Sequence, residues 1–345
     1  MAHRIGIVGA SGYGGAELMR LLDGHPAIDL AVVAAHSQTD TPISQLFPNL
    51  AGTATFDHAD PDVLSDLDLV VLATPHAAAL ELGGQLYDAG TAVVDLSAAF
   101  RLSAEGFVQW YGQPHPRPDL AAGDPAVADD VAYGLPEQHR ARIRDARLVA
   151  NPGCYPTATL LGLSPIAGML EPGSIVIDAK SGTSGAGRAA QDHLHFAHVH
   201  GSLTAYSAPG HRHTGEIERW LPGDLGAVTF TPHLVPMSRG LLATAYGTLV
   251  SDATAGDVAD ALHDAYVDEP FVHVLPAGTF PQTKALAGSN GCQLSAVVDA
   301  RTGRVTVTSA IDNLGKGAAG QVLQNVNLLL GVEETAGLSA IGVYP

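Results

Sequence analysis

The sequence predicts an α/β protein of two domains, the first built on a parallel sheet and the second an α+β domain with a mostly antiparallel sheet. Three observations predict this fold class. The chain opens with a strand, a glycine-rich turn and a helix; short apolar strands then alternate with helical segments; and the later segments are rich in β-forming residues separated by turns. Alternation of the first kind is typical of a doubly wound sheet with helices on both faces.

We expect the first domain over residues 1–150. Apolar runs of four to eight residues predict its strands, at 4–8, 28–35, 68–73, 91–96 and 147–150. One helix is predicted after the glycine turn, ending at Gly24, and another over 77–87. Residues 133–137 are expected to form a turn, because they contain Gly and Pro.

We expect the second domain over residues 151–314. A helix is predicted at 157–169 and another at 254–266. Strands are predicted at 174–179, 228–234, 241–250, 292–299 and 304–310. The tail over 315–331 has helical periodicity after a glycine-rich start.

Composition excludes several classes of partner. The chain has 35 acidic and 17 basic residues and a formal net charge of −18, so nucleic acid and anionic membranes would repel it on average. It shows neither a signal pattern nor an apolar run long enough to span a bilayer. Its two cysteines, Cys154 and Cys292, have no spacing that suggests a disulfide framework or a zinc site. We therefore expect a soluble cytoplasmic protein that acts on a small molecule.

The glycine turn after the first strand has the spacing Gly9-x-x-Gly12-x-x-Gly15. Such glycines let the backbone approach a pyrophosphate that lies on the N-terminus of the following helix. The motif alone is weak evidence, but its place between the first strand and the first helix favours a dinucleotide site. The expected cofactor ligands in this turn are Gly9, Ser11, Gly12, Tyr13, Gly14 and Gly15.

The second strand ends without an acidic residue. An Asp or Glu at this point would hold the adenine ribose of NAD, whereas here the chain reads Ala-His-Ser-Gln-Thr over residues 35–39. A short polar loop leaves room for a 2′-phosphate, so NADP is favoured over NAD, with Ser37 as a candidate ligand. The alternative is that Asp40 takes the acidic role.

Cys154 stands in the segment Asn151-Pro-Gly-Cys-Tyr-Pro-Thr157. A tight turn that places a thiol at a helix start favours the thiolate, since the unpaired N–H groups and the positive end of the helix dipole stabilise the anion. This context predicts a nucleophile. The alternative is a small buried hydrophobic residue, the usual state of an isolated cysteine.

Two histidine clusters and a second glycine-rich stretch complete the candidate sites. The first cluster, His193-x-His195-x-x-His198-x-His200, could bind a metal ion. We disfavour a metal site because Asp192 is the only nearby carboxylate, and the role of this cluster stays open. His211-Arg212-His213 offers an acid/base group beside an anion ligand. The stretch 181–188, Ser-Gly-Thr-Ser-Gly-Ala-Gly-Arg, could line the cofactor or the substrate phosphate through backbone N–H groups, or be a surface turn.

These motifs, together with Asp312-Asn-Leu-Gly-Lys-Gly-Ala-Ala-Gly-Gln321, closely resemble the N-acetyl-γ-glutamyl-phosphate reductase family of arginine biosynthesis, in order over nearly the whole chain. The resemblance implies an N-terminal Rossmann domain that the tail helix completes, and a second domain like that of glyceraldehyde-3-phosphate dehydrogenase that carries catalysis and oligomerisation. It also implies NADPH as reductant and a homo-oligomer.

The resemblance further implies roles for individual residues. Cys154 would be the nucleophile and His213 the acid/base, with Arg101, His211 and Arg212 toward the substrate. Ser184, Gly185 and Asn313 would contact the cofactor. Two departures from the family pattern are Ala99, where Asp is usual, and Thr214-Gly215, where a proline often stands.

The predicted activity is NADPH-dependent reduction of N-acetyl-γ-glutamyl phosphate to N-acetylglutamate 5-semialdehyde through a Cys154 thioester. Three alternatives stay open at this point. One is the same chemistry on a carrier-bound aminoadipyl or glutamyl phosphate, which the acidic charge balance disfavours. Another is aspartate-semialdehyde dehydrogenase, which the residues around Cys154 disfavour. The third is a non-enzymatic NADPH sensor, which would need no reactive thiol.

Overall fold

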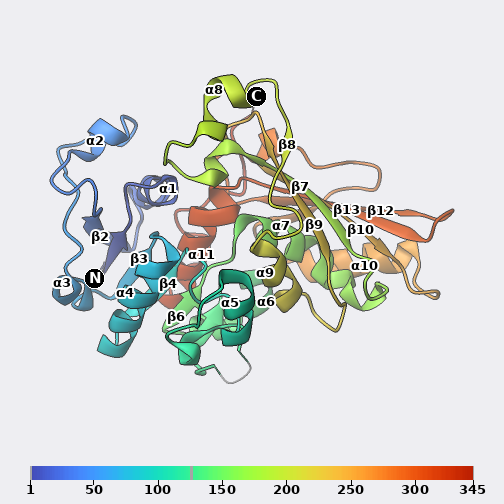
Figure 1. Ribbon diagram of the computed structural model, residues 1–345, viewed down its shortest axis with the longest axis horizontal. Coiled ribbons are helices and arrows are strands. Elements are labelled where there is room, and N and C mark those ends of the chain that lie inside the picture. The colour runs from blue at the N-terminus through green and yellow to red at the C-terminus, as the bar shows by residue number, and fades with distance from the viewer. Residues whose placement is uncertain (1, 125–126, 345) are drawn as a thin grey trace. The chain divides into compact units, whose positions relative to one another are not determined.

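The computed structural model describes residues 2–124 and 127–344 (Figure 1). The chain divides into two compact units. The first unit runs to Gly153 and also includes Ala318–Leu338, and the second contains Cys154–Gly317 and the segment from Ser339 onward. The first unit is therefore built from two stretches of chain that are separated by more than 160 residues.

The first unit contains a six-stranded parallel sheet in the order β2-β1-β3-β4-β6-β5. Its strands are β1 His3–Val8, β2 Ile28–Ala34, β3 Leu69–Leu72, β4 Ala92–Asp95, β5 Val131–Tyr133 and β6 Leu148–Ala150. All five pairings are parallel, as the alternation predicts. The expected turn at 133–137 is wrong in part, because Tyr133 closes β5 and Pro136 already begins a helix.

Helices of the first unit pack on this sheet and on one another. They are α1 Tyr13–Leu22, α2 Ile43–Leu46, α3 Pro61–Ser65, α4 His76–Ala89, α5 Ala104–Tyr111, η1 Pro118–Leu120, α6 Pro136–Arg144 and α11 Gly320–Leu329. The tail helix α11 packs beside α1 and α6 (Figure 1). Val322, Leu323 and Val326 of α11 share a buried core with Ile5 and Ile7 of β1, so the tail supplies part of the core of this unit.

The second unit contains a seven-stranded mixed sheet in the order β11-β12-β13-β10-β7-β9-β8. Its strands are β7 Val176–Gly182, β8 Thr204–Ala205, β9 Thr229–Val235, β10 Leu241–Thr248, β11 Val272–Val274, β12 Cys292–Asp299 and β13 Arg304–Ile311. Four of the six pairings are antiparallel; β7 with β9 and β11 with β12 are parallel. The predicted mostly antiparallel sheet is confirmed.

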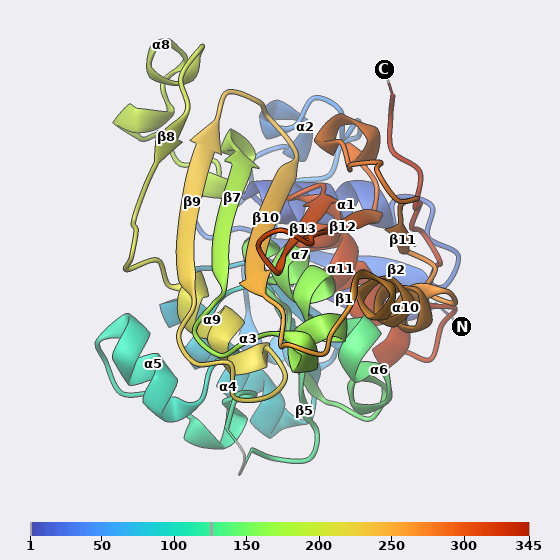
Figure 2. The ribbon, with the colours of Figure 1, turned by 90° about the vertical axis from the view of Figure 1, so that its right-hand side faces the viewer.

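Helices cover one face of this mixed sheet. α7 Cys154–Leu163 packs on β10 and β13, and α10 Ala255–Tyr266 packs on β11 and β12. The remaining short elements are η2 Ser164–Met169, η3 Thr183–Ala186, η4 Asp192–Leu194, α8 Phe196–Val199, α9 His213–Trp220, η5 Thr283–Leu286 and η6 Gly315–Ala319. Figure 2 shows the broad faces of β9, β7 and β10 turned toward the viewer, with α7 behind β10.

The helix expected at 157–169 begins earlier and ends earlier than its sequence pattern indicates. It starts at Cys154 itself, and after Leu163 the chain tightens into the 3₁₀ turns of η2, where Pro165 cannot donate the next helical hydrogen bond. From Tyr155 to Leu163 every residue of α7 is buried, so this helix shows no amphipathic stripe that could mark its ends. The early start matters because it makes Cys154 the first residue of the helix.

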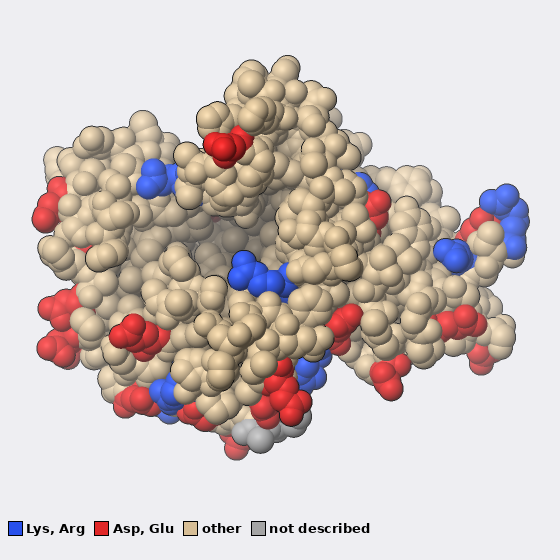
Figure 3. Space-filling model, in the orientation of Figure 1, with Lys and Arg blue, Asp and Glu red and all other residues tan. Residues whose placement is uncertain are grey.

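The surface reflects the acidic composition. In Figure 3 acidic side chains are scattered over the visible face and basic ones are fewer. Within residues 2–124 and 127–344, no helix has both the length and the apolar character needed to cross a membrane.

Candidate active site

Cys154 stands at the N-terminus of α7, in a position that close backbone packing creates. A Cβ atom on Gly317 would lie 2.8 Å from the Cβ of Cys154, so only glycine fits beside the thiol. Cys154 is partly exposed, whereas Cys292 is fully buried in β12 with its Sγ atom 3.5 Å from the hydroxyl oxygen of Ser309. The two thiols therefore differ in access, and Cys154 is the one that a reagent or substrate can reach.

The turn that leads into Cys154 is anchored within the first unit. Arg101 donates a hydrogen bond from Nε to the carbonyl oxygen of Asn151 (2.8 Å) and another from a terminal nitrogen to that of Leu96 (2.7 Å). The side-chain amide of Asn325 on α11 donates to the side-chain oxygen of Asn151 (3.0 Å) and to the carbonyl of Gly134 (2.9 Å). Asn151 is completely buried, so these bonds hold the start of the Asn-Pro-Gly turn in one place.

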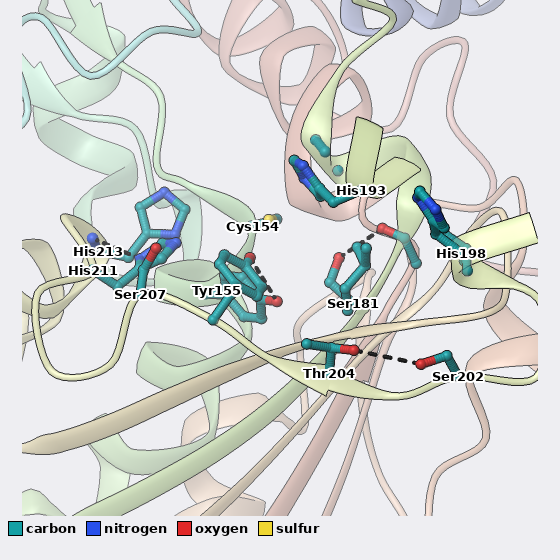
Figure 4. A pocket seen from close by; sticks show the side chains of 16 residues that line it. Cys154, Tyr155, Ser181, His193, His198, Ser202, Thr204, Ser207, His211 and His213 are labelled. Atoms are coloured by element: carbon teal, nitrogen blue, oxygen red, sulfur yellow. Dashed lines mark hydrogen bonds between the residues drawn. The ribbon is translucent and has the colours of Figure 1, made fainter. Parts of the chain in front are cut away.

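A cavity of about 630 Å³ opens beside Cys154, and all sixteen residues that line it belong to the second unit (Figure 4). They are Cys154, Tyr155, Ser181, Gly182, Gly185, Ala186, His193, His198, Val199, Ser202, Thr204, Tyr206, Ser207, His211, His213 and Leu234. Its size suits a small metabolite. In Figure 4, His211, His213 and Ser207 lie on one side of Cys154, and His193, His198 and Ser181 lie on the other.

His211 and His213 face the same cavity, with ring centroids 4.8 Å apart. They do so because Arg212 has helical backbone angles and His213 begins α9, whereas an extended segment would turn the two side chains to opposite faces. The backbone N–H of His213 donates to Nδ1 of His211 (3.2 Å), so the proton of a neutral His211 ring lies on Nε2. Burial, and then the charge of Arg212, lower the pKa of His211 to about 4. At neutral pH His211 is therefore a neutral donor.

Two tyrosines that the sequence analysis did not single out complete this side of the cavity. The Tyr155 hydroxyl donates to the carbonyl of His233 (3.2 Å) and lies 3.2 Å from the Tyr206 hydroxyl, which is then the donor of that pair. Burial raises the pKa of both tyrosines, and proximity to Cys154 adds to the rise. Both are thus neutral. Tyr155 could have been predicted as a site residue from the sequence, because it follows Cys154 directly. Tyr206 could not, because 51 residues separate it from Tyr155.

The second glycine-rich stretch and the predicted cofactor amide come together in the second unit. The side-chain amide of Asn313 donates to the Ser184 hydroxyl (2.8 Å), and its oxygen accepts from the backbone N–H of Gly240 (2.7 Å). A Cβ atom on Gly185 would lie 2.9 Å from the hydroxyl of Ser181 and 3.5 Å from the Asn313 amide. Ser184, Gly185 and Asn313 therefore form one cluster, with Gly185 on the cavity wall.

The glycine turn after β1 is tightly packed and leads directly into α1. Gly9 has a φ of 89° and a Cβ there would lie 2.4 Å from the carbonyl oxygen of Ala73, so no other residue fits. α1 begins at Tyr13 with Gly12 as its N-cap, and it has neither a side-chain cap hydrogen bond nor an acidic residue in its first turn. The N-terminus of this ten-residue helix is thus suited to an anion. The exposed Ser37 follows β2 in the same unit.

The structure places the two expected arginines outside the cavity lining. Arg101 is only 6% exposed, and two of its nitrogens bind backbone carbonyls of the first unit. Arg212 is exposed and occupies the N-cap of α9. Over the described ranges, no cluster of three or more His, Cys, Asp or Glu side chains is arranged to hold a metal ion.

Comparison with known proteins decides the family. A model of the semialdehyde dehydrogenase NAD-binding domain matches residues 4–146, and one of the semialdehyde dehydrogenase dimerisation domain matches residues 154–313. N-acetyl-γ-glutamyl-phosphate reductase of Pseudomonas aeruginosa is 46% identical over 352 residues, 99% of each chain, and that of Symbiobacterium thermophilum is 46% identical over 355 residues, 100% of each. The chain belongs to the N-acetyl-γ-glutamyl-phosphate reductase family.

Solved structures of semialdehyde dehydrogenases share the fold of this family member. Aspartate semialdehyde dehydrogenase II from Vibrio cholerae, complexed with ASA, superposes with a TM-score of 0.72 at 16% identity, over 96% of this chain and 99% of that one. The enzyme from Candida albicans with NADP gives 0.72 at 14% identity over the same shares. At such low identity the likeness shows the fold alone, and the predicted architecture is confirmed.

Proposed function

We propose that the protein catalyses the NADPH-dependent reduction of N-acetyl-γ-glutamyl phosphate to N-acetylglutamate 5-semialdehyde and phosphate, a step of arginine biosynthesis. The observation that carries the proposal is the partly exposed thiol of Cys154 at a helix start, inside a cavity with two imidazoles, in a chain that is 46% identical to reductases of this name over almost its entire length.

Cys154 begins the reaction as a thiolate, which the N-terminus of α7 stabilises. Its sulfur forms a bond to the γ-carbonyl carbon of the acyl phosphate. The bond from that carbon to the phosphate oxygen breaks, phosphate leaves and takes one proton from the solvent, and a thioester remains on Cys154. Backbone N–H groups in the first turn of α7, beside Cys154, are donors for the oxyanion of the tetrahedral intermediate, a contribution typically of about 3–4 kcal/mol.

The imidazoles of His211 and His213 have different roles in the reaction. His211, neutral with its proton on Nε2, donates a hydrogen bond to the substrate oxygen without transferring charge. His213, at the start of α9, supplies a proton to the oxygen that becomes anionic and takes it back when the carbon–sulfur bond breaks. Release of the aldehyde then regenerates the Cys154 thiolate.

The nicotinamide cofactor, when bound, supplies the hydride that reduces the thioester. The glycine turn with its uncapped α1 N-terminus fits the pyrophosphate of such a cofactor, through Gly9, Ser11, Gly12, Tyr13, Gly14 and Gly15. We favour NADPH over NADH because the loop after β2 has no carboxylate at its start, and Ser37 is exposed there. Ser184, Gly185 and Asn313 would orient the nicotinamide end, and Arg101 and Arg212 would act toward the substrate.

The open face of the mixed sheet is the proposed surface for homo-oligomerisation. Val176, Tyr246 and Val297 are large apolar residues that are 36–40% exposed on β7, β10 and β12, and the match to a dimerisation domain covers them. Sedimentation velocity should show at least twice the chain mass of 35.4 kDa, and a monomer would contradict this surface. The free state of both cysteines fits the cytoplasm, which we propose as the compartment.

A reverse assay tests the activity. Purified protein is mixed with NADP⁺, inorganic phosphate and either N-acetylglutamate 5-semialdehyde or aspartate semialdehyde, and NADPH formation is followed by absorbance. We expect phosphate-dependent turnover with the acetylated substrate and at least about 100-fold lower kcat/KM with the other, because its chain is shorter by one methylene and has no acetyl group. Preference for aspartate semialdehyde would replace the proposal by that activity, and binding of NADP⁺ without any turnover would favour a sensor.

A further inference from the structure

The cavity beside Cys154 has no permanent charge on its wall. Among the described residues that line it, none is Lys, Arg, Asp or Glu. The groups on its wall that can become cations are the four imidazoles of His193, His198, His211 and His213. Any positive charge that this wall presents to a ligand must therefore come from histidine.

Two of these imidazoles already have roles in the proposed mechanism. His211 is neutral at neutral pH because burial lowers its pKa to about 4, and His213 serves as the acid/base group. His193 and His198 have no role in that chemistry. In Figure 4 they lie on the other side of Cys154 from the first two, and both are exposed to solvent, where a charged imidazole keeps part of its hydration.

The ring of His198 is oriented by its own backbone. Its Nδ1 lies 2.6 Å from the carbonyl oxygen of Asp192, so Nδ1 must be the donor of this bond. The other nitrogen, Nε2, then becomes a donor only when the ring is protonated. His193 lies beside Asp192 in η4, which packs against α8, so one short segment brings both imidazoles to the cavity.

We propose that His193 and His198 form the subsite that recognises the α-carboxylate of the substrate. The inference rests on the proposed function, because the substrate carries two oxyanions, a carboxylate at one end and a phosphate at the other. The carboxylate is assigned here since it is planar with two acceptor oxygens, which two separate N–H donors can satisfy, whereas a phosphate dianion has three terminal oxygens and calls for more donors.

Steady-state kinetics in the reverse direction distinguish the two oxyanions, because semialdehyde and inorganic phosphate are then separate substrates. In H193N/H198N the KM for N-acetylglutamate 5-semialdehyde should rise roughly 10- to 100-fold, the loss expected for charge-assisted hydrogen bonds. The kcat and the KM for phosphate should change less than about threefold. The matched control is H195N/H200N, which removes two imidazoles of the same segment that do not line the cavity and should behave as the wild type.

A rise in the KM for phosphate alone would assign the subsite to phosphate and overturn the proposal. So would a fall in kcat with unchanged KM values, or an equal effect of the control pair. Both double variants could also lose affinity for the semialdehyde and melt at a lower temperature. This result would show that substrate binding requires only a folded histidine segment, and it would also overturn the proposal.

A binding measurement separates this inference from the activity itself. Calorimetry compares N-acetyl-L-glutamine, which has the α-carboxylate, with its α-amide, which lacks it; neither can be reduced by the enzyme. The wild type should bind the carboxylate at least about tenfold more tightly, and H193N/H198N should not distinguish the two. Equal affinity of the wild type for both compounds, or no affinity for either, overturns the subsite. Discrimination without any turnover in the assay above would instead leave the subsite standing and reject the reductase function.

Discussion

The two units both contain a glycine-rich turn after a strand, yet the turns lead to different structures. In the first unit the turn after β1 enters the ten-residue helix α1, whose N-terminus has no side-chain cap. In the second unit the stretch after β7 forms only the 3₁₀ turn η3, where the hydroxyl of Ser184 and the amide of Asn313 bind one another. The first turn offers a helix terminus to phosphate, and the second offers side-chain groups beside a cavity.

The two cysteine thiols and the cavity, in contrast to the glycine turns, belong to one unit only. Both cysteines of the chain lie in the second unit, and so do all the residues that line the cavity. The comparison teaches that the proposed pyrophosphate turn and the thiol lie in separate parts of the chain, although the residues proposed for the nicotinamide end share the unit of the thiol. Substitutions should therefore be able to weaken pyrophosphate binding without changing the reactivity of the thiol, and the reverse.

The largest effect is expected from Cys154→Ser. Loss of the thiolate should lower kcat by roughly 10⁴-fold or more, since the residue forms the covalent intermediate. The affinity for NADP⁺, measured by fluorescence titration, should change less than about twofold. A variant that keeps more than a hundredth of the wild-type kcat would show that Cys154 is not the nucleophile.

Cys292→Ala is the matched control for this change. Because Cys292 is buried in β12, its removal should lower stability modestly and leave kcat of the folded protein within about twofold. Alkylation with iodoacetamide at mildly acidic pH, followed by peptide mapping, should modify Cys154 first. Preferential labelling of Cys292 would show that Cys292, and not Cys154, is the reactive thiol.

The next effect concerns the two neighbouring imidazoles within the second unit. His213→Asn should lower kcat about 10²–10⁴-fold, the usual range for a general acid/base, and leave the labelling rate of Cys154 and the affinity for NADP⁺ largely intact. His211→Asn should cost less, because Asn can still donate a hydrogen bond where neutral His211 does. If His211→Asn proves the more damaging of the two, the acid/base role belongs to His211.

The smallest effect concerns the first unit. Ser37→Asp places a carboxylate near the expected 2′-phosphate and should weaken NADPH binding about tenfold, by like-charge repulsion, without altering the alkylation of Cys154. Ser37→Asn has a similar size and no charge, so it should change the affinity much less. Wild-type protein that binds NADH as tightly as NADPH would contradict the cofactor preference and indicate Asp40 as the ribose ligand.

Much of the fold was predictable because the periodicity of a sequence reports burial. The strand β3 and most of β1 and β4 are apolar runs, as strands buried on both faces should be, and all three appear within two residues of the predicted positions. β5 was missed because it has only three residues and ends in a Gly-Leu-Pro turn. The start of α7 was predicted at residue 157, because Pro156 suggested the beginning of a helix, and the helix in fact begins three residues earlier, at Cys154.

The candidate site was predictable where local chemistry marks a residue, as at Cys154 and the Gly9 turn. It was not predictable where residues distant in the sequence meet. Nothing near Tyr206 announces its contact with Tyr155, and nothing in the spacing of the first histidine cluster separates His193 and His198, which line the cavity, from His195 and His200, which do not. Such contacts depend on how the segment from 187 to 212 folds over the mixed sheet, and its mostly polar and small residues carry little periodic signal.

The return of α11 to the first unit has a consequence for the order of synthesis. Its residues Val322, Leu323 and Val326 complete a core whose other members, among them Ile5 and Leu18, leave the ribosome far earlier. The 185 residues that follow Gly153, up to Leu338, take roughly 10–40 s to translate at about 5–20 residues per second. During that interval the nascent N-terminal sheet exposes the apolar surface that α11 will cover, so this protein should depend on chaperones more while it is being made than after its release.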